Sequence, residues 1–136
     1  MKKVFLDTAY AIALSAVNDQ HHEAATILAE EIEKQNWQIV TTRAVLIEIG
    51  NALSKQRYRK AGLALLEALE EDPTVDIIPV TEELYATAYQ LYSARLDKEW
   101  GLTDCISFVV MAENGITEAL TTDEHFVQAG FRAMLD

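Results

Sequence analysis

Short apolar runs alternate with segments of helical periodicity along almost the whole chain, and this alternation limits the folds that it can adopt. The apolar runs predict five strands, at 3–6, 37–40, 75–80, 116–121 and 131–135. The periodic segments predict seven helices, at 9–17, 20–36, 44–56, 58–70, 82–98, 104–112 and 124–128. Strands that alternate with helices pair in parallel, with helices on both faces of the sheet. We therefore expect an α/β protein in three layers, with Pro79 marking an edge strand.

The length of 136 residues suits one domain with a full core, and no repeat or linker divides the chain. We predict a single domain over residues 1–136. Lys2 and Lys3 precede the first apolar run as in a signal peptide, but Asp7 interrupts that run. No run reaches the roughly 18 apolar residues of a membrane span, so we expect an unprocessed protein without a membrane segment. The single cysteine, Cys105, forms no internal disulfide, which suits a reducing cytoplasm.

The chain is strongly acidic, with 22 Asp and Glu, 11 Lys and Arg, and a formal charge of −11. This balance argues against binding duplexes or anionic membranes by bulk attraction, so any nucleic-acid contact must be local. Four basic residues nevertheless surround Tyr58, namely Lys55, Arg57, Arg59 and Lys60. We predict RNA contacts there, with a solvated helix-hairpin tip as the alternative. Arg43 is a second candidate, either for phosphate or for an internal ion pair.

Four carboxylates stand beside apolar segments. Asp7 ends the first predicted strand, Asp123 follows the fourth, Asp104 opens the most apolar helix, and Glu48 interrupts another apolar helix. In an open α/β sheet, strand ends and the starts of the next helices meet at one edge, where ligands bind. Each acid alone also fits a local role, as a helix-opening residue or, for Glu48, as a solvent-facing one. Together they would repel one another unless cations neutralise them, so we predict a site for Mg²⁺ or Mn²⁺.

Such a site suits phosphodiester hydrolysis, because one ion activates the attacking water and a second ion stabilises the leaving oxygen. No protein nucleophile is then needed. The chain has no Gly-rich phosphate loop, and its histidines, His21, His22 and His125, have no triad or zinc spacing. We interpret His125, two residues after Asp123, as a residue that supports the site rather than as a ligand.

Four stretches of the sequence resemble the PIN-domain ribonucleases, and among them the VapC-type toxins of bacterial toxin–antitoxin pairs. The stretches are VFLDT (4–8), LIEIGNAL (46–53), LTDCISF (102–108) and LTTDEHF (120–126), and together they extend across essentially the whole chain. The resemblance implies a PIN-like α/β/α fold with strand order 3-2-1-4-5, which would bring Asp7 beside Asp123. It also implies a set of catalytic metal ligands and two supporting hydroxyls. The ligands are Asp7, Glu48, Asp104 and Asp123, and the hydroxyls belong to Thr8 and Thr122.

The function that the resemblance implies is that of a metal-dependent endoribonuclease, the toxin of a toxin–antitoxin pair. Two Mg²⁺ or Mn²⁺ ions would be its cofactors. Its partners would be an RNA substrate, a small antitoxin protein and a second copy of the chain in a homodimer. The nearest alternative is a stand-alone PIN nuclease that processes RNA.

Two function classes outside the nucleases have acidic α/β sites of similar size. Phosphoacceptor signalling domains share the α/β fold and an acidic Mg²⁺ pocket, but they need paired acids after the first strand and a lysine after the last. This chain has only Asp7 in the first place and no lysine after Lys98. Aspartyl phosphatases carry a second Asp two residues on, where this chain has Ala9. A scaffold without nuclease activity is the remaining alternative, and the presence of all four acids argues against it.

Overall fold

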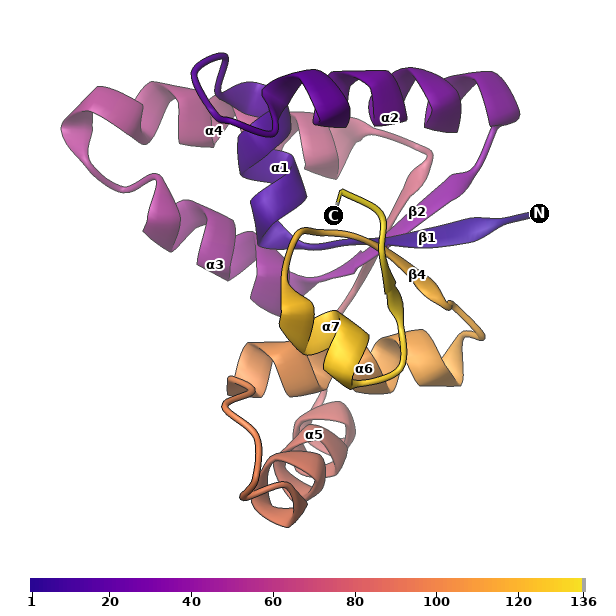
Figure 1. Cartoon of the computed structure of the whole chain (residues 1–136). Coiled ribbons are helices and arrows are strands. Elements are labelled where there is room, and N and C mark those ends of the chain that lie inside the picture. Colours follow the sequence, from indigo (N-terminus) through magenta and orange to yellow (C-terminus); the bar gives the residue numbers. More distant parts are fainter. Residues whose placement is uncertain (136) are drawn as a thin grey trace.

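The computed structural model describes residues 1–135, which form five strands and seven helices in the predicted order (Figure 1). In chain order these are β1 (Lys3–Leu6), α1 (Thr8–Ser15), α2 (His22–Gln35), β2 (Gln38–Thr42), α3 (Arg43–Ala52), α4 (Gln56–Glu71), β3 (Val75–Ile78), α5 (Glu82–Ala94), α6 (Leu102–Glu113), β4 (Glu118–Leu120), α7 (Glu124–Gln128) and β5 (Arg132–Ala133). All strand pairs are parallel, in the order β3-β2-β1-β4-β5. The predicted fold class and strand order are confirmed, and β3 is an edge strand, as Pro79 indicated.

The helices cover both faces of the sheet. On one face lie α1, α2 and α4, whereas α6 covers the other face with α7 beside it (Figure 1). Helix α5 packs mainly against α6 and forms the outermost element on that side. Helix α3 contacts both α1 and α6, so it lies at the edge of the sheet where the strands end. No helix among residues 1–135 is long and apolar enough to cross a membrane.

The core surrounds the central strand. In β1, Val4 and Phe5 have no exposed surface, because helices cover this strand on both sides. The ring centres of Phe5 and of Phe126 in α7 lie 6.3 Å apart. The ring centres of Phe126 and of Phe108 in α6 lie 5.0 Å apart, in an edge-to-face arrangement. This aromatic chain fixes α6 and α7 against the strand that leads to Asp7.

Strand register brings the two chain segments that follow β1 and β4 to the same place. Leu6 of β1 is aligned with Leu120 of β4. The backbone N–H of Asp7 donates to the carbonyl of Leu120 at 3.3 Å, which extends the pairing by one residue. The side chains after both strands therefore emerge next to each other at the carboxyl edge of the sheet.

Helix ends differ from their predictions by up to four residues, and α3 ends at Ala52 rather than at 56. Helix α5 ends at Ala94 rather than near Lys98, because Arg95 leaves helical geometry and pairs with Asp97. Leu96, which falls inside the predicted helix 82–98, lies in the loop after α5 and is 90% exposed. Helix α6 begins after Gly101 rather than after Thr103. Its first turn starts earlier because the carboxylate of Asp104 accepts a hydrogen bond from the N–H of Gly101.

Candidate active site

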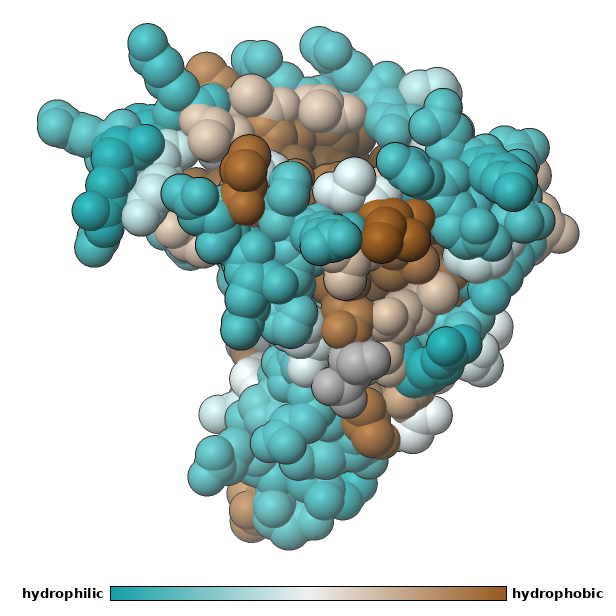
Figure 2. Space-filling model, turned by 45° about the horizontal axis from the view of Figure 1, so that its top comes forward, coloured by the Kyte–Doolittle hydropathy of each residue, from teal (hydrophilic) through white to brown (hydrophobic). Residues whose placement is uncertain are grey.

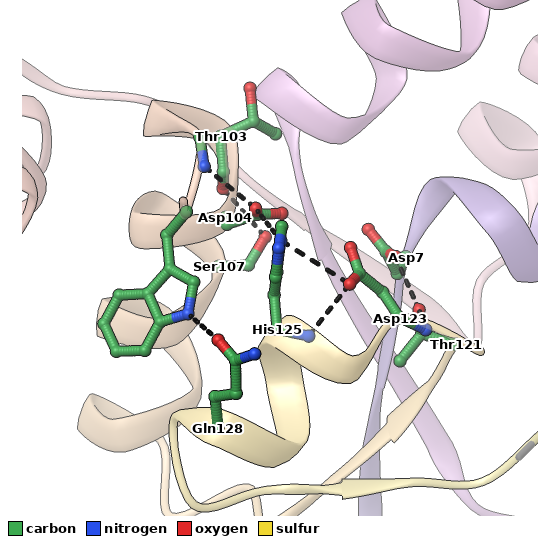
Figure 3. Close-up of polar contacts among 10 residues, drawn as sticks. Asp7, Thr103, Asp104, Ser107, Thr121, Asp123, His125 and Gln128 are labelled. Carbon is green, nitrogen blue, oxygen red and sulfur yellow. Dashed lines mark hydrogen bonds and ion pairs between the residues drawn. The ribbon is translucent and has the colours of Figure 1, made fainter. Parts of the chain in front are cut away.

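Three of the four predicted acids lie together at the carboxyl edge of the sheet (Figure 3). Asp7 follows β1, Asp123 precedes α7, and Asp104 is in the first turn of α6. The strand register brings Asp7 next to the segment of Asp123, more than a hundred residues later in the chain, and the α6–α7 contact adds Asp104.

Asp7 is the most buried of the acids, with 6% of its surface exposed. The buried hydroxyl of Thr121 donates to Asp7 Oδ2 at 2.7 Å. Burial raises the pKa of Asp7 from 3.8 to about 6, even though hydrogen bonds from Thr121 and from the Thr8 backbone favour the charged form. The negative charges of Glu48 and Asp104 raise it further. Without a neutralising cation, ionisation of Asp7 therefore costs more free energy here than in water.

Glu48 joins the site through Thr8. The Thr8 hydroxyl, at the start of α1, donates to Glu48 Oε1, on the second turn of α3. Because Thr8 directly follows Asp7, this bond places the Glu48 carboxylate close enough to act on the charge of Asp7. The interruption of an apolar helix by Glu48 is explained by a side chain that faces the site rather than open solvent.

His125 lies between the carboxylates of Asp104 and Asp123. Its Nδ1 is 3.1 Å from Asp104 Oδ2 and 3.5 Å from Asp123 Oδ1, as the dashed lines in Figure 3 show. Its backbone N–H also donates to Asp123 Oδ1 at 2.9 Å. Ligand atoms of Asp104, Asp123 and His125 all lie within 4.8 Å of one another, a spacing that a metal ion can bridge. His125, interpreted from the sequence as a supporting residue, is thus also a candidate ligand.

The donor chemistry of this cluster fits a hard divalent cation. Asp7, Glu48, Asp104 and Asp123 supply carboxylate oxygens, the ligands that Mg²⁺ and Mn²⁺ prefer. Burial and, after it, the charges of Glu48 and Asp104 raise the pKa of Asp7, and a bound cation would favour its ionised form. An oxygen-rich cluster of this kind can hold the metal, the water and the phosphate of a phosphodiester hydrolysis.

Two supporting residues were missed by the sequence reasoning. Thr122 was the predicted support, but among residues 1–135 its side chain makes no hydrogen bond, whereas that of Thr121 bonds Asp7. Neighbouring side chains of an extended segment point to opposite faces of the sheet, so only one of the two threonines after β4 can lie on the side of the Asp7 carboxylate. Thr121 Oγ1 also accepts from the backbone N–H of Asp123 at 3.1 Å, which ties two of the acids to one hydroxyl. The contact of Gly101 with Asp104 could not be predicted, because it is made by a backbone N–H that every residue except proline has.

The predicted RNA contacts lie apart from the acids. Lys55, Arg57, Arg59 and Lys60 are exposed at the turn between α3 and α4 and the start of α4. Hydrophilic side chains project from the left edge of the molecule in Figure 2, where Figure 1 places this turn. Arg43 forms an ion pair with Glu70, which is the second of its two predicted roles.

Comparisons with known proteins agree with this geometry. The family model of the PIN domain matches residues 4–132. The 23S rRNA-specific endonuclease VapC20 of Mycobacterium tuberculosis is 28% identical over 133 residues, which cover 94% of this chain and 95% of that protein. The crystal structure of VapC20, a toxin that cleaves the sarcin–ricin loop, matches with a TM-score of 0.85 and 27% identity, over 94% of this chain and 95% of that one.

A more distant match shows the fold alone. The crystal structure of VapBC2 from Rickettsia felis, bound to a DNA fragment from its promoter, matches with a TM-score of 0.72 at 15% identity, over 96% of each chain. The match of the family model extends over almost the whole chain. This chain therefore belongs to the PIN domain family.

Proposed function

We propose that this chain is a metal-dependent endoribonuclease and the toxin of a toxin–antitoxin pair. The observation that carries the proposal is the convergence of Asp7, Asp104 and Asp123 at one edge of the sheet, with Glu48 joined to them through Thr8. The description of VapC20 as an rRNA-specific endonuclease supports RNA as the substrate. Large-subunit rRNA is therefore the first substrate to test.

In this proposal, the four acids hold two Mg²⁺ or Mn²⁺ ions, and His125 is a further candidate ligand beside Asp104 and Asp123. Divalent ions at such a site supply an activated water and stabilise the leaving oxygen of the cleaved phosphodiester. The protein contributes a rigid arrangement of ligands, because hydrogen bonds to each carboxylate limit its rotation. With a pKa of about 6, Asp7 is mostly ionised at pH 7 and able to bind a cation.

Each acid has its own orienting partner. Thr121 holds Asp7 by a buried hydroxyl, and Thr8 holds Glu48. The N–H of Gly101 holds Asp104 at the start of α6, where the helix dipole favours negative charge. When Nδ1 of His125 carries the proton, the ring donates to Asp104.

The basic turn between α3 and α4 is proposed to contact the RNA backbone. Glu48 lies four residues before Ala52, the end of α3, which corresponds to about 6 Å along the helix, and the basic turn follows directly. A strand of RNA at the acids is therefore able to reach Arg57 and Arg59, and Tyr58 adds an aromatic surface for a base. Arg43 is already paired with Glu70 and is the weaker candidate.

An antitoxin is the proposed regulator. A cluster of carboxylates on a chain of charge −11 attracts a cationic segment, and an arginine can engage two carboxylates at once. The homodimer, the cytoplasmic location and the single domain over 1–136 stay predictions. Size-exclusion chromatography with light scattering tests the dimer directly.

The deciding experiment incubates the purified chain with ribosomes and with a pool of structured RNAs, in Mg²⁺ or Mn²⁺. We expect cleavage that EDTA stops and that returns when the metal is restored. Co-expression with a small protein encoded next to this chain should suppress RNA cleavage. Changing the arginine that this protein places at the acids to alanine should relieve the suppression. Cleavage without an inhibitory partner would favour a stand-alone RNA-processing nuclease, and absence of cleavage under all conditions would contradict the proposal.

A further inference from the structure

A hollow of about 360 Å³ opens between the end of α5 and the start of α6. Its wall includes Tyr92, Arg95, Leu96, Lys98, Trp100 and Gly101. Small-molecule sites span roughly 300–1,000 Å³, so this α5–α6 hollow has room for one nucleotide-sized group and not for a duplex. We infer that the α5–α6 hollow binds one unpaired base of the RNA substrate. The inference rests on the proposed ribonuclease function and adds a base-binding subsite to it.

Two planar groups of the hollow are held in place by the protein itself. Trp100 is 6% exposed, and its indole N–H donates to Gln128 at 3.0 Å. The guanidinium of Arg95 lies 5.1 Å from the centre of the Trp100 ring and makes two hydrogen bonds of 3.0 Å to Asp97. Since both groups are ordered before a ligand arrives, binding does not have to immobilise them.

Two apolar side chains stand exposed at the same hollow. Tyr92 is 48% exposed and Leu96 is 90% exposed. A single exposed apolar side chain is ordinary. Here, however, the two lie beside the guanidinium of Arg95, which the buried Trp100 indole and Asp97 hold in place. Proteins bind unpaired RNA bases by stacking them on aromatic rings and on arginine planes, so this combination suits a base better than a sugar or a metal ion.

The hollow adjoins the acid cluster through Gly101. Gly101 lines it and donates its backbone N–H to Asp104 Oδ2 at 3.0 Å. Lys98 lines both this hollow and a second one, of about 250 Å³, that His125 also lines. An RNA strand with a phosphate at the acids therefore has a neighbouring base beside the α5–α6 hollow. The ammonium of Lys98 lies 3.7 Å from Asp97 Oδ2, and it would have to turn from this carboxylate to reach the phosphate between them.

The test measures the binding of labelled RNA pentamers of each base by fluorescence anisotropy, with Ca²⁺ in place of Mg²⁺ and with pentamer integrity checked on a gel. We expect Tyr92→Ala to weaken binding by about 5- to 150-fold, the loss that removing one stacking side chain causes. Tyr92→Phe keeps the ring and should bind like the parent. Tyr85→Ala is the matched control, because Tyr85 is on the same helix, is 46% exposed and does not line the hollow.

Equal affinities for Tyr92→Ala and Tyr85→Ala, or no binding of any pentamer by the parent, would overturn the subsite. Cleavage kinetics separate this inference from the proposed function, since Tyr92→Ala should raise KM more than it lowers kcat. If Tyr92→Ala cleaves RNA with the KM of the parent, the proposed nuclease function stands and the proposed subsite is wrong. If Tyr92→Ala weakens pentamer binding but the parent cleaves no RNA, the subsite stands and the proposed nuclease function is wrong.

Discussion

The acid cluster and the basic turn between α3 and α4 carry opposite charges and are built in opposite ways. Asp7 is buried, and the carboxylates of the cluster accept hydrogen bonds from groups of other elements. At the basic turn, the side chains are exposed, and the contacts of Arg57 and Arg59 are with their own neighbours, Tyr58 and Ser54. A buried charged group is strongly affected by each partner, whereas an exposed one is screened by solvent. Changes in the cluster should therefore have large effects, and changes at the turn small ones.

The largest expected effect is on catalysis. Asp7→Asn should reduce RNA cleavage below detection, because it removes a proposed metal ligand, and loss of a supporting partner alone costs about 10- to 100-fold. The measurement is a single-turnover cleavage assay with contaminating nucleases excluded. Asp76→Asn, at an exposed carboxylate in β3, is the control and should cleave normally. A normal rate for Asp7→Asn would remove Asp7 from the mechanism.

The same substitution should stabilise the metal-free protein. The pKa of Asp7 is about 6 in the folded state and 3.8 in the unfolded chain, so the folded state loses stability as Asp7 ionises between these values. In EDTA at pH 7.5, Asp7→Asn should therefore unfold with a free energy up to about 3 kcal/mol higher than the parent. Near pH 4 the two proteins should be about equally stable. Urea unfolding at both pH values measures this, and a pH-independent difference would contradict it.

Metal should stabilise the parent by a similar amount. A hundredfold excess of Mg²⁺ or Mn²⁺ over its Kd should raise the free energy of unfolding by about 2.7 kcal/mol for one site. Glu48→Gln and Asp104→Asn should each reduce this gain, and Asp76→Asn should not. Thermal melts across a metal titration provide the readout. A melting temperature of the parent that does not respond to metal would count against the site.

A smaller effect distinguishes the two neighbouring threonines. Thr121→Val keeps the shape of a buried side chain but removes the hydroxyl shared by Asp7 and the Asp123 backbone. Cleavage should fall by about 10- to 100-fold. Thr122→Val should leave the rate close to that of the parent. If both variants lose the same activity, the assignment of the supporting role to Thr121 is wrong.

The smallest effect belongs to the basic turn. Arg57→Ala combined with Arg59→Ala should weaken the salt dependence of RNA binding. The slope of the logarithm of the binding constant against the logarithm of the salt concentration should become less negative by about 0.7 per lost phosphate contact. Lys3→Ala combined with Lys34→Ala changes the net charge equally at exposed sites outside the turn and is the control. If both double variants show the slope of the parent, the turn is only a solvated hairpin tip.

Most of the fold was predictable because hydrophobic periodicity reports local structure directly. The five strands, the parallel pairing and the edge position of β3 followed from apolar runs, helical spacing and one proline. The end of α5 was not predictable in this way, because the pairing of Arg95 with Asp97 competes with the helix. The exposure of Leu96 is a consequence of that competition.

For the site, the sequence by itself determined which acids follow strand ends or begin helices. Such positions meet at one edge of a parallel sheet, so the sequence also determined that these acids lie near one another. Side-chain direction within the site was decided only by the tertiary structure. The contact of Thr121 with Asp7 depends on the register of β1 against β4, and the position of His125 between Asp104 and Asp123 depends on the packing of α7 against α6. Periodicity records which residues are buried, but partners that are twenty to more than a hundred residues apart meet only when the whole core is packed.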